Sequence, residues 1–161
     1  MHTIIAVARS ADHEFSKQLL NCIDLIKGEG VAGDCHRGVT VKHRSRVAVD
    51  PTQPNLRQVH LIHAELFDEL STFGHTVKPG QLGENITTRG IDLLALPRDT
   101  LLMLGKSAVI QLTGLRNPCH QIEDFQTGLL SKVVYKHDDG TLVRKTGVMA
   151  VVLEGGIVSI A

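Results

Sequence analysis

Aromatic residues are scarce in this sequence, and neither sign of charge is in excess. Aromatic side chains make up 3% of the 161 residues and tryptophan is absent, which argues against a base-stacking platform for single-stranded nucleic acid. Lysine and arginine number 17, as do aspartate and glutamate, so the formal net charge is zero. Proteins that hold nucleic acid or an anionic membrane surface by charge usually carry a basic excess, so we expect neither partner.

Long apolar runs and paired cysteines are also missing. The sequence has no run of about 18 apolar residues, the length that spans a bilayer, and residues 1–15 lack the basic and long apolar regions of a secretion signal. The three cysteines, Cys22, Cys35 and Cys119, form an odd and widely spaced set rather than a disulfide framework. We therefore expect a cytoplasmic protein, and the length predicts one domain over residues 1–161.

Apolar patterning predicts many short strands and few helices. Residues 63–73 place apolar side chains along one helix face, residues 121–134 predict one or two short helices, and a further helix is predicted over residues 12–20. Strands are predicted over residues 3–8, 21–27, 46–49, 57–62, 92–96, 100–104, 107–113, 147–154 and 157–160, where β-branched or alternating apolar segments are bounded by turn residues. The fold is therefore predicted to be mainly β, a barrel or a sandwich with a few peripheral short helices.

The segment Arg116-Asn-Pro-Cys-His120 surrounds one cysteine with features that activate thiols. Pro118 favours an extended backbone before it, and the residues after 120 are typical of a helix, so Cys119 is predicted at or near a helix N-terminus. The helix dipole and the neighbouring Arg116 would favour its thiolate. The alternative is a small buried apolar side chain, and the residues alone leave both interpretations open.

The nine histidines are candidate metal ligands. His60 and His63 stand three apart, but a predicted strand-to-helix boundary falls between them and no third ligand has a recognised spacing. Cys35 and His36 form an equally incomplete pair. We therefore expect no structural zinc.

A basic run lies between residues 37 and 46. Its members are Arg37, Lys42, His43, Arg44 and Arg46. Such a run usually forms a solvated loop, which is the interpretation favoured here. The alternative is a cradle for an anion such as phosphate.

Five segments, in order along the chain, resemble the MOSC domain, which is named for the C-terminal part of molybdenum cofactor sulfurase. They are Gly30-Val-Ala-Gly-Asp-Cys-His36, Arg57-Gln-Val-His-Leu61, Pro79-Gly-Gln-Leu-Gly-Glu-Asn-Ile-Thr87, Leu115-Arg-Asn-Pro-Cys119 with Gln121-Ile122, and Gly147-Val-Met-Ala-Val-Val-Leu-Glu-Gly-Gly156. The resemblance covers about residues 28–156. It implies a compact MOSC-type β-barrel with a few peripheral short helices.

The resemblance implies that Cys119 matches the family's key cysteine, for which two uses are described. In relatives that reduce N-hydroxylated compounds, this cysteine ligates the molybdenum of a bound pterin, the molybdenum cofactor (molybdopterin). In sulfur-carrier proposals it holds sulfur as a persulfide, delivered by a pyridoxal-phosphate-dependent cysteine desulfurase. A thiolate suits both uses, because it is a soft metal ligand and a nucleophile toward sulfane sulfur.

Further site residues follow from the resemblance alone. Arg57 and Arg116 would pair with the phosphate of the cofactor, since guanidinium groups bind phosphate through two parallel hydrogen bonds. Asp34, His36, Glu84 and Asn85 would hydrogen-bond the pterin or shape the pocket.

We therefore expect a protein that binds the molybdenum cofactor through Cys119 and supports redox or sulfur-transfer chemistry. Its partner would be a reductase component or a cysteine desulfurase, and an enzymatic role is favoured. Two alternatives stay open, a metal-free persulfide carrier and a non-catalytic binding module on the same fold, because a fold does not fix a function.

Overall fold

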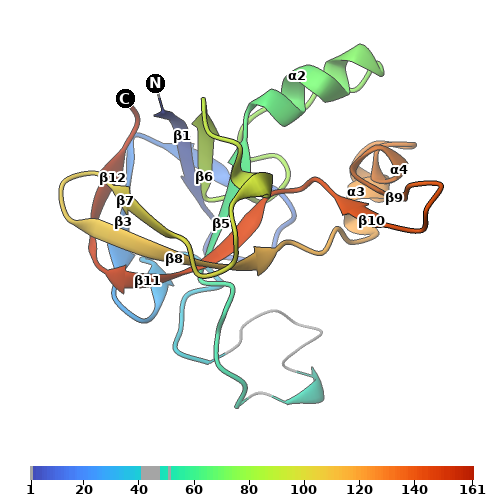
Figure 1. Cartoon of the computed structure of the whole chain (residues 1–161). Coiled ribbons are helices and arrows are strands. Elements are labelled where there is room, and N and C mark those ends of the chain that lie inside the picture. The colour runs from blue at the N-terminus through green and yellow to red at the C-terminus, as the bar shows by residue number, and fades with distance from the viewer. Residues whose placement is uncertain (1, 41–47, 51) are drawn as a thin grey trace.

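Seven strands form one curled sheet, which confirms the prediction of a mainly β, barrel-type fold (Figure 1). The computed structural model describes residues 2–40, 48–50 and 52–161. The strand order is β2-β1-β6-β5-β11-β8-β7. Their bounds are β1 Thr3–Arg9, β2 Gln18–Leu20, β5 Val59–His63, β6 Ile86–Arg89, β7 Leu101–Leu104, β8 Ala108–Leu115 and β11 Val148–Glu154. Neighbouring strands are antiparallel except β5 and β6, which run parallel.

A second sheet of three strands packs against the curled sheet and encloses the core. It consists of β12 (Gly156–Ser159), β3 (Cys22–Ile26) and β4 (Gly30–Val31). In β3 the buried Ile23 and Leu25 alternate with exposed residues, which is the pattern of a strand with one face in the core. Both sheets contribute to this core, whose members include Val7, Ile23, Leu25, Val31, Leu61, Ile110, Ala150 and Val158.

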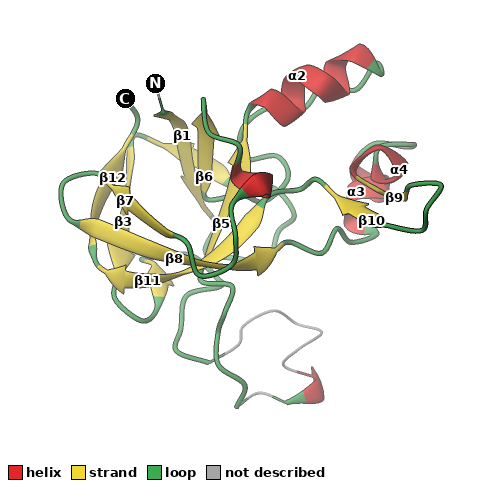
Figure 2. Cartoon of the chain, in the orientation of Figure 1, coloured by secondary structure: helices red, strands yellow, loops and turns green. Residues whose placement is uncertain are grey.

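Short helices build a second apolar cluster beside the barrel. Helix α2 (Glu65–Thr72) connects β5 to β6 and buries Leu66, Phe67 and Leu70, as its apolar stripe predicts. Helices α3 (Gln121–Phe125) and α4 (Leu130–Val133) lie with the hairpin of β9 (Val134–Lys136) and β10 (Leu142–Arg144) on one side of the barrel (Figure 2). The cluster includes Ile62, Leu66, Leu70, Ile122, Leu129 and Val133. In the described ranges, helices long and apolar enough to cross a membrane are absent.

The helix predicted over residues 12–20 is wrong. This segment forms bends followed by β2, because its polar groups are held by a distant loop. The Lys17 amide donates to the carbonyl of Gly80 at 2.8 Å, and the Ser16 hydroxyl donates to the carbonyl of Gln81 at 2.8 Å. Pairing with β1 then extends residues 18–20.

The strand predicted over residues 92–96 is also wrong, because these residues form the 3-10 helix η1 (Leu93–Ala95). Local bonds from Ala95 to Asp92 and from Leu96 to Leu93 close the turn and bury Leu93. The strand predicted over residues 46–49 lies partly outside the described residues, and Ala48 and Val49 are helical.

Candidate functional site

The loop after β8 is fixed to the loop before β6 by Arg116. The Arg116 amide donates to the carbonyl of Gly147 at 3.0 Å, and its Nη1 donates to the carbonyl of Leu82 at 2.6 Å. Gly147 has a φ of +84° and lies so close to the carbonyl of Leu61 that a Cβ would collide with it. Only glycine tolerates both conditions readily, so Gly147 lets the start of β11 press on β5 and hold the Arg116 loop.

Cys119 lies in this loop, partly exposed, beside a guanidinium. Its sulfur contacts Gln121 Oε1 at 3.6 Å, and Arg116 also hydrogen-bonds to it. Burial lowers the pKa of Arg116, and the charges of Cys119 and Glu84 act against that change. The sulfur is therefore not enclosed as an apolar core side chain would be. Helix α3 begins two residues later and has only five residues. The Arg116 guanidinium therefore affects the Cys119 sulfur more than the helix dipole does.

Glu84 lies fully buried close to Arg116. Its Oε1 accepts hydrogen bonds from the Gly80 amide and, at 3.2 Å, from the Thr87 hydroxyl. Its Oε2 has no hydrogen-bond partner among the residues that the structure describes. Burial raises the pKa of the Glu84 carboxyl, and the charge of Arg116 partly offsets that. The buried Glu84 side chain therefore helps to hold the Arg116 guanidinium in position.

Asp34, His36 and Asn85 gather around a buried lysine that the sequence analysis missed. Lys17 Nζ lies 2.8 and 2.9 Å from the two Asp34 oxygens, and both side chains are almost completely buried. Asp34 also accepts from the amides of Ser10 and His36 at 3.1 Å and from Asn85 Nδ2 at 3.3 Å. Burial would raise the pKa of Asp34, but the hydrogen bond from His36 and the charge of Lys17 hold it well below its usual range.

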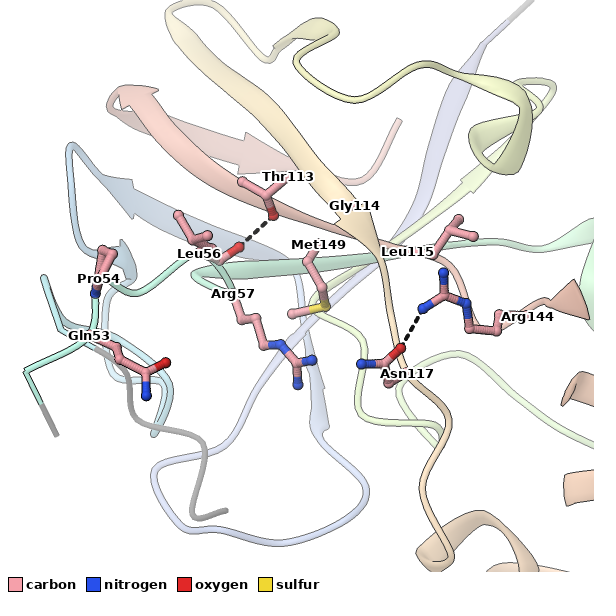
Figure 3. Close-up of a pocket in the computed structure, with 10 residues that line it drawn as sticks. All are labelled: Gln53, Pro54, Leu56, Arg57, Thr113, Gly114, Leu115, Asn117, Arg144 and Met149. Carbon is pink, nitrogen blue, oxygen red and sulfur yellow. Dashed lines mark hydrogen bonds between the residues drawn. The ribbon is translucent and has the colours of Figure 1, made fainter. Parts of the chain in front are cut away.

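A cavity of about 250 Å³ opens between the start of β5 and the Cys119 loop. Figure 3 shows Arg57 and Met149 extending into it, with Asn117 opposite and hydrogen-bonded to Arg144. Its described lining residues include these two arginines and no carboxylate. The Nε of Arg144 is a buried donor without a hydrogen-bond partner among the described residues. This arrangement suits an anion, because the described lining carries two guanidinium groups and no carboxylate.

The structure thus divides the predicted site residues into three groups. Arg57 lines the cavity, Cys119 and Arg116 lie in the loop after β8 close to Glu84 from the loop before β6, and Asp34, His36 and Asn85 surround Lys17. Arg116, predicted to bind phosphate, is not among the lining residues of the cavity. Arg144 lines the cavity together with Arg57, and its position at the end of the unpredicted strand β10 left no signal in the sequence.

The structure describes both members of the histidine pair but only Arg37 of the basic run. His60 is buried, and its Nε2 donates to the carbonyl of Thr146 at 2.7 Å, while the half-buried His63 lies further along β5. Burial lowers the pKa of both imidazoles, which suits structural neutral side chains. Arg37 pairs with Glu29 at 3.3 Å, and the rest of the basic run lies outside the described residues.

Comparison with known proteins gives a family. The MOSC domain family matches residues 32–160. The chain belongs to this family. The MOSC chain is similar in structure to the YuaD protein of Bacillus subtilis, with a TM-score of 0.75 and 21% identity over 99% of this chain and 92% of that one. Comparison with curated proteins gives no match.

Two YiiM proteins share the same fold. That of Geobacillus stearothermophilus has a TM-score of 0.68 at 15% identity, covering 99% of this MOSC chain and 71% of its own. That of Escherichia coli has a TM-score of 0.62 at 18% identity, covering 98% of this chain and 65% of its own. At these identities the likeness is one of fold.

Proposed function

We propose that this MOSC protein binds the molybdenum cofactor, with the Cys119 sulfur as a ligand of the metal and the arginine-lined cavity as the site of the cofactor's phosphate. The observation that carries the proposal is the position of Asn117. It lies two residues before Cys119, lines the cavity and accepts a hydrogen bond from Arg144. One short loop therefore joins a partly exposed sulfur to an anion site.

The donor chemistry of these residues fits the cofactor. A thiolate is a soft ligand, which suits a metal already held by the sulfurs of a pterin. The Nε of Arg144, which has no hydrogen-bond partner among the described residues, and the guanidinium of Arg57 offer hydrogen-bond donors for a phosphate. The cavity of about 250 Å³ is smaller than most small-molecule pockets, which measure about 300–1,000 Å³. We therefore assign the phosphate-bearing end of the cofactor to it and leave the metal at the open Cys119 loop.

The protein's own residues would prepare this site. Arg116 supplies a positive charge next to the Cys119 sulfur, where it would face a sulfur bound to the metal. The buried Glu84 and the Leu82 carbonyl hold the guanidinium in place. When bound, the cofactor would supply redox chemistry at molybdenum. The MOSC chain would contribute the thiolate, the phosphate site and their relative position.

A second candidate function is a persulfide carrier without metal, which the exposure of the Cys119 loop supports. The Cys119 thiolate would attack the outer sulfur of a persulfide on a cysteine desulfurase. A sulfur–sulfur bond would form on Cys119 while the bond in the donor breaks, and the donor cysteine would leave as a thiolate. The transferred sulfur keeps its oxidation state, so the step needs no further oxidant.

The test is to purify the protein from a host that makes the molybdenum cofactor and to measure molybdenum and pterin per chain. We expect both in the wild type, loss of molybdenum in Cys119→Ser, and unchanged contents in Cys22→Ser, which removes an exposed thiol elsewhere. Arg144→Gln should lower the pterin content at least about tenfold, because a charged hydrogen bond to phosphate contributes about 1.5–3 kcal/mol.

Each other outcome is informative. Equal molybdenum in the wild type and Cys119→Ser would contradict the assignment of the ligand. A wild type without molybdenum or pterin that gains one sulfur atom on Cys119 after incubation with a desulfurase would assign the carrier function instead. A chain that shows neither would be a binding module on the MOSC fold.

A further inference from the structure

We propose that His13, Cys35 and His36 form a Zn²⁺ site that is distinct from the Cys119 loop. One potential ligand atom from each residue lies within 4.8 Å of the other two. The three side chains come from two segments that are far apart in sequence, the bends before β2 and the loop after β4. Among the described residues, no other group of histidine, cysteine and carboxylate side chains brings three potential ligand atoms this close together.

The separations are close to those that zinc requires. Bond lengths of about 2.0–2.3 Å in a tetrahedral site place neighbouring ligand atoms about 3.5 Å apart. The Cys35 sulfur already lies 3.4 Å from Nδ1 of His36, and the rings of His13 and His36 meet edge to face at 5.5 Å between centroids. His13 lies in the exposed segment before β2, and one of its ring nitrogens is already within 4.8 Å of the other two ligand atoms.

Hydrogen bonds hold the backbone of Cys35 and His36 in place. The Cys35 amide donates to the carbonyl of Ser10 at 2.7 Å, which joins the two segments directly. The His36 amide donates to Asp34 Oδ2 at 3.1 Å, and His36 Nδ1 lies 3.6 Å from the same oxygen. The Asp34 carboxylate therefore holds the backbone of His36 and lies beside its ring.

The charges around the site are compatible with a doubly charged metal ion. Lys17 Nζ lies 3.5 Å from His36 Nδ1, but its charge is offset by Asp34 through the buried ion pair at 2.8 Å. A Cys35 thiolate would then reduce the charge of the metal, because binding replaces the thiol proton.

The ligand set selects the metal. Two imidazoles and one thiolate are typical of Zn²⁺, whereas Ca²⁺ and Mg²⁺ require oxygen ligands. Three protein ligands leave one position of a tetrahedron for water or another group. The metal would fasten the segment before β2 to the loop after β4. This inference replaces the expectation that the chain has no structural zinc, since the spacing of Cys35 and His36 in the sequence gives no sign that His13 lies next to them.

Cobalt binding tests the site without reference to molybdenum. Co²⁺ replaces Zn²⁺ in such sites and gives a thiolate-to-cobalt band in the near ultraviolet and intense visible bands when four-coordinate. We expect the metal-free full-length protein to bind one equivalent of Co²⁺ with both features, and Zn²⁺ to abolish them by displacement. The thiolate band should vanish in Cys35→Ser, and His13→Ala should weaken binding at least about tenfold.

Matched variants keep the result specific. Cys119→Ser and Cys22→Ser should retain the thiolate band, and His137→Ala, which removes an exposed histidine of the β9–β10 hairpin, should bind Co²⁺ as the wild type does. No thiolate band in the wild type, or the same band in Cys35→Ser, would overturn the site. Since Cys119→Ser is a control here, failure of the zinc site and failure of the molybdenum proposal are separate results.

Discussion

Asp34 is a buried carboxylate that depends on one buried cation. Lys17 contacts both of its oxygens, and the side chains of the two residues are 3% and 0% exposed. Two backbone amides and Asn85 satisfy its remaining hydrogen-bonding capacity. Its pKa is held far below the usual range, so its stabilising effect is complete above the ordinary aspartate value of about 3.9 and is lost as the pH falls below it.

Replacing Lys17 by methionine should destabilise the fold by about 3–5 kcal/mol, because it leaves a buried carboxylate without a counter-charge. Lys27→Met is the matched control, since Lys27 pairs with Glu154 in the open, at 70% and 60% exposure, where such pairs contribute about 0–1 kcal/mol. Urea unfolding measures both variants. Adding Asp34→Asn to Lys17→Met should recover part of the loss, and equal losses in Lys17→Met and Lys27→Met would refute this account of the pair.

Single residues were predictable from sequence where a local motif marks them. Cys119 stands out because proline and arginine flank it within four residues, and the structure places it partly exposed beside Arg116. Lys17, Arg144 and His13 were not predictable, because each reaches its cluster from a segment distant in sequence. Arg144, for example, meets Asn117 across 27 positions, and periodicity or spacing carries no record of such a contact.

At the scale of elements, the link between β10 and β11 is fixed to β5 by a histidine that must stay neutral. His60 Nε2 donates to the carbonyl of Thr146, and Gly147 allows the two segments to touch. Burial lowers the pKa of His60 well below its ordinary value, and the charges of Arg116 and Lys17 lower it further. Hydrogen bonds of the imidazole to the backbone of Thr146 and Gly83 oppose this change without reversing it.

This arrangement makes the stability of the fold depend on pH. Below the ordinary histidine pKa of about 6.5, the unfolded chain takes up a proton at position 60 that the folded protein excludes. The free energy of unfolding should therefore fall on acidification, with His60 contributing up to about 1.4 kcal/mol per pH unit. Urea unfolding between pH 7 and pH 5 measures the slope, which should be smaller in His60→Gln.

The control for this prediction is His137→Gln, which removes an exposed histidine and should leave the slope unchanged. A slope remains in His60→Gln, because the half-buried His63, whose pKa is also lowered, adds to the fall, while the buried Glu84, whose pKa is raised, opposes it. An identical slope in the wild type and His60→Gln would mean that His60 can be protonated in the folded protein.

Elements followed from the sequence where one face is buried and turn residues bound the segment. The strands β3 and β8 and the helix α2 bury alternate or stripe-forming residues, which is the signal that periodicity detects. The bends over residues 12–17 and the helix η1 escaped prediction because tertiary hydrogen bonds and the burial of a single leucine decide them. Local propensity is overridden in such cases.

At the scale of the whole molecule, the two sheets carry partly exposed cysteines on separate loops. Cys119 follows β8 next to a cavity with two arginines, and Cys35 follows β4 next to two histidines. The first suits a metal already held by another ligand, and the second suits a bare zinc ion. The MOSC fold thus supplies rigid strands, and the loops between them supply the chemistry.

The most direct test of the central claim is the alkylation of Cys119 in protein with and without the molybdenum cofactor. Protein from a cofactor-producing host and from a molybdate-starved host would be treated briefly with iodoacetamide, and the modified fraction of each cysteine read from peptide masses. The account predicts that the cofactor protects Cys119 while the exposed Cys22 reacts equally in both samples. Equal alkylation of Cys119 in molybdenum-loaded and molybdenum-free protein would contradict it.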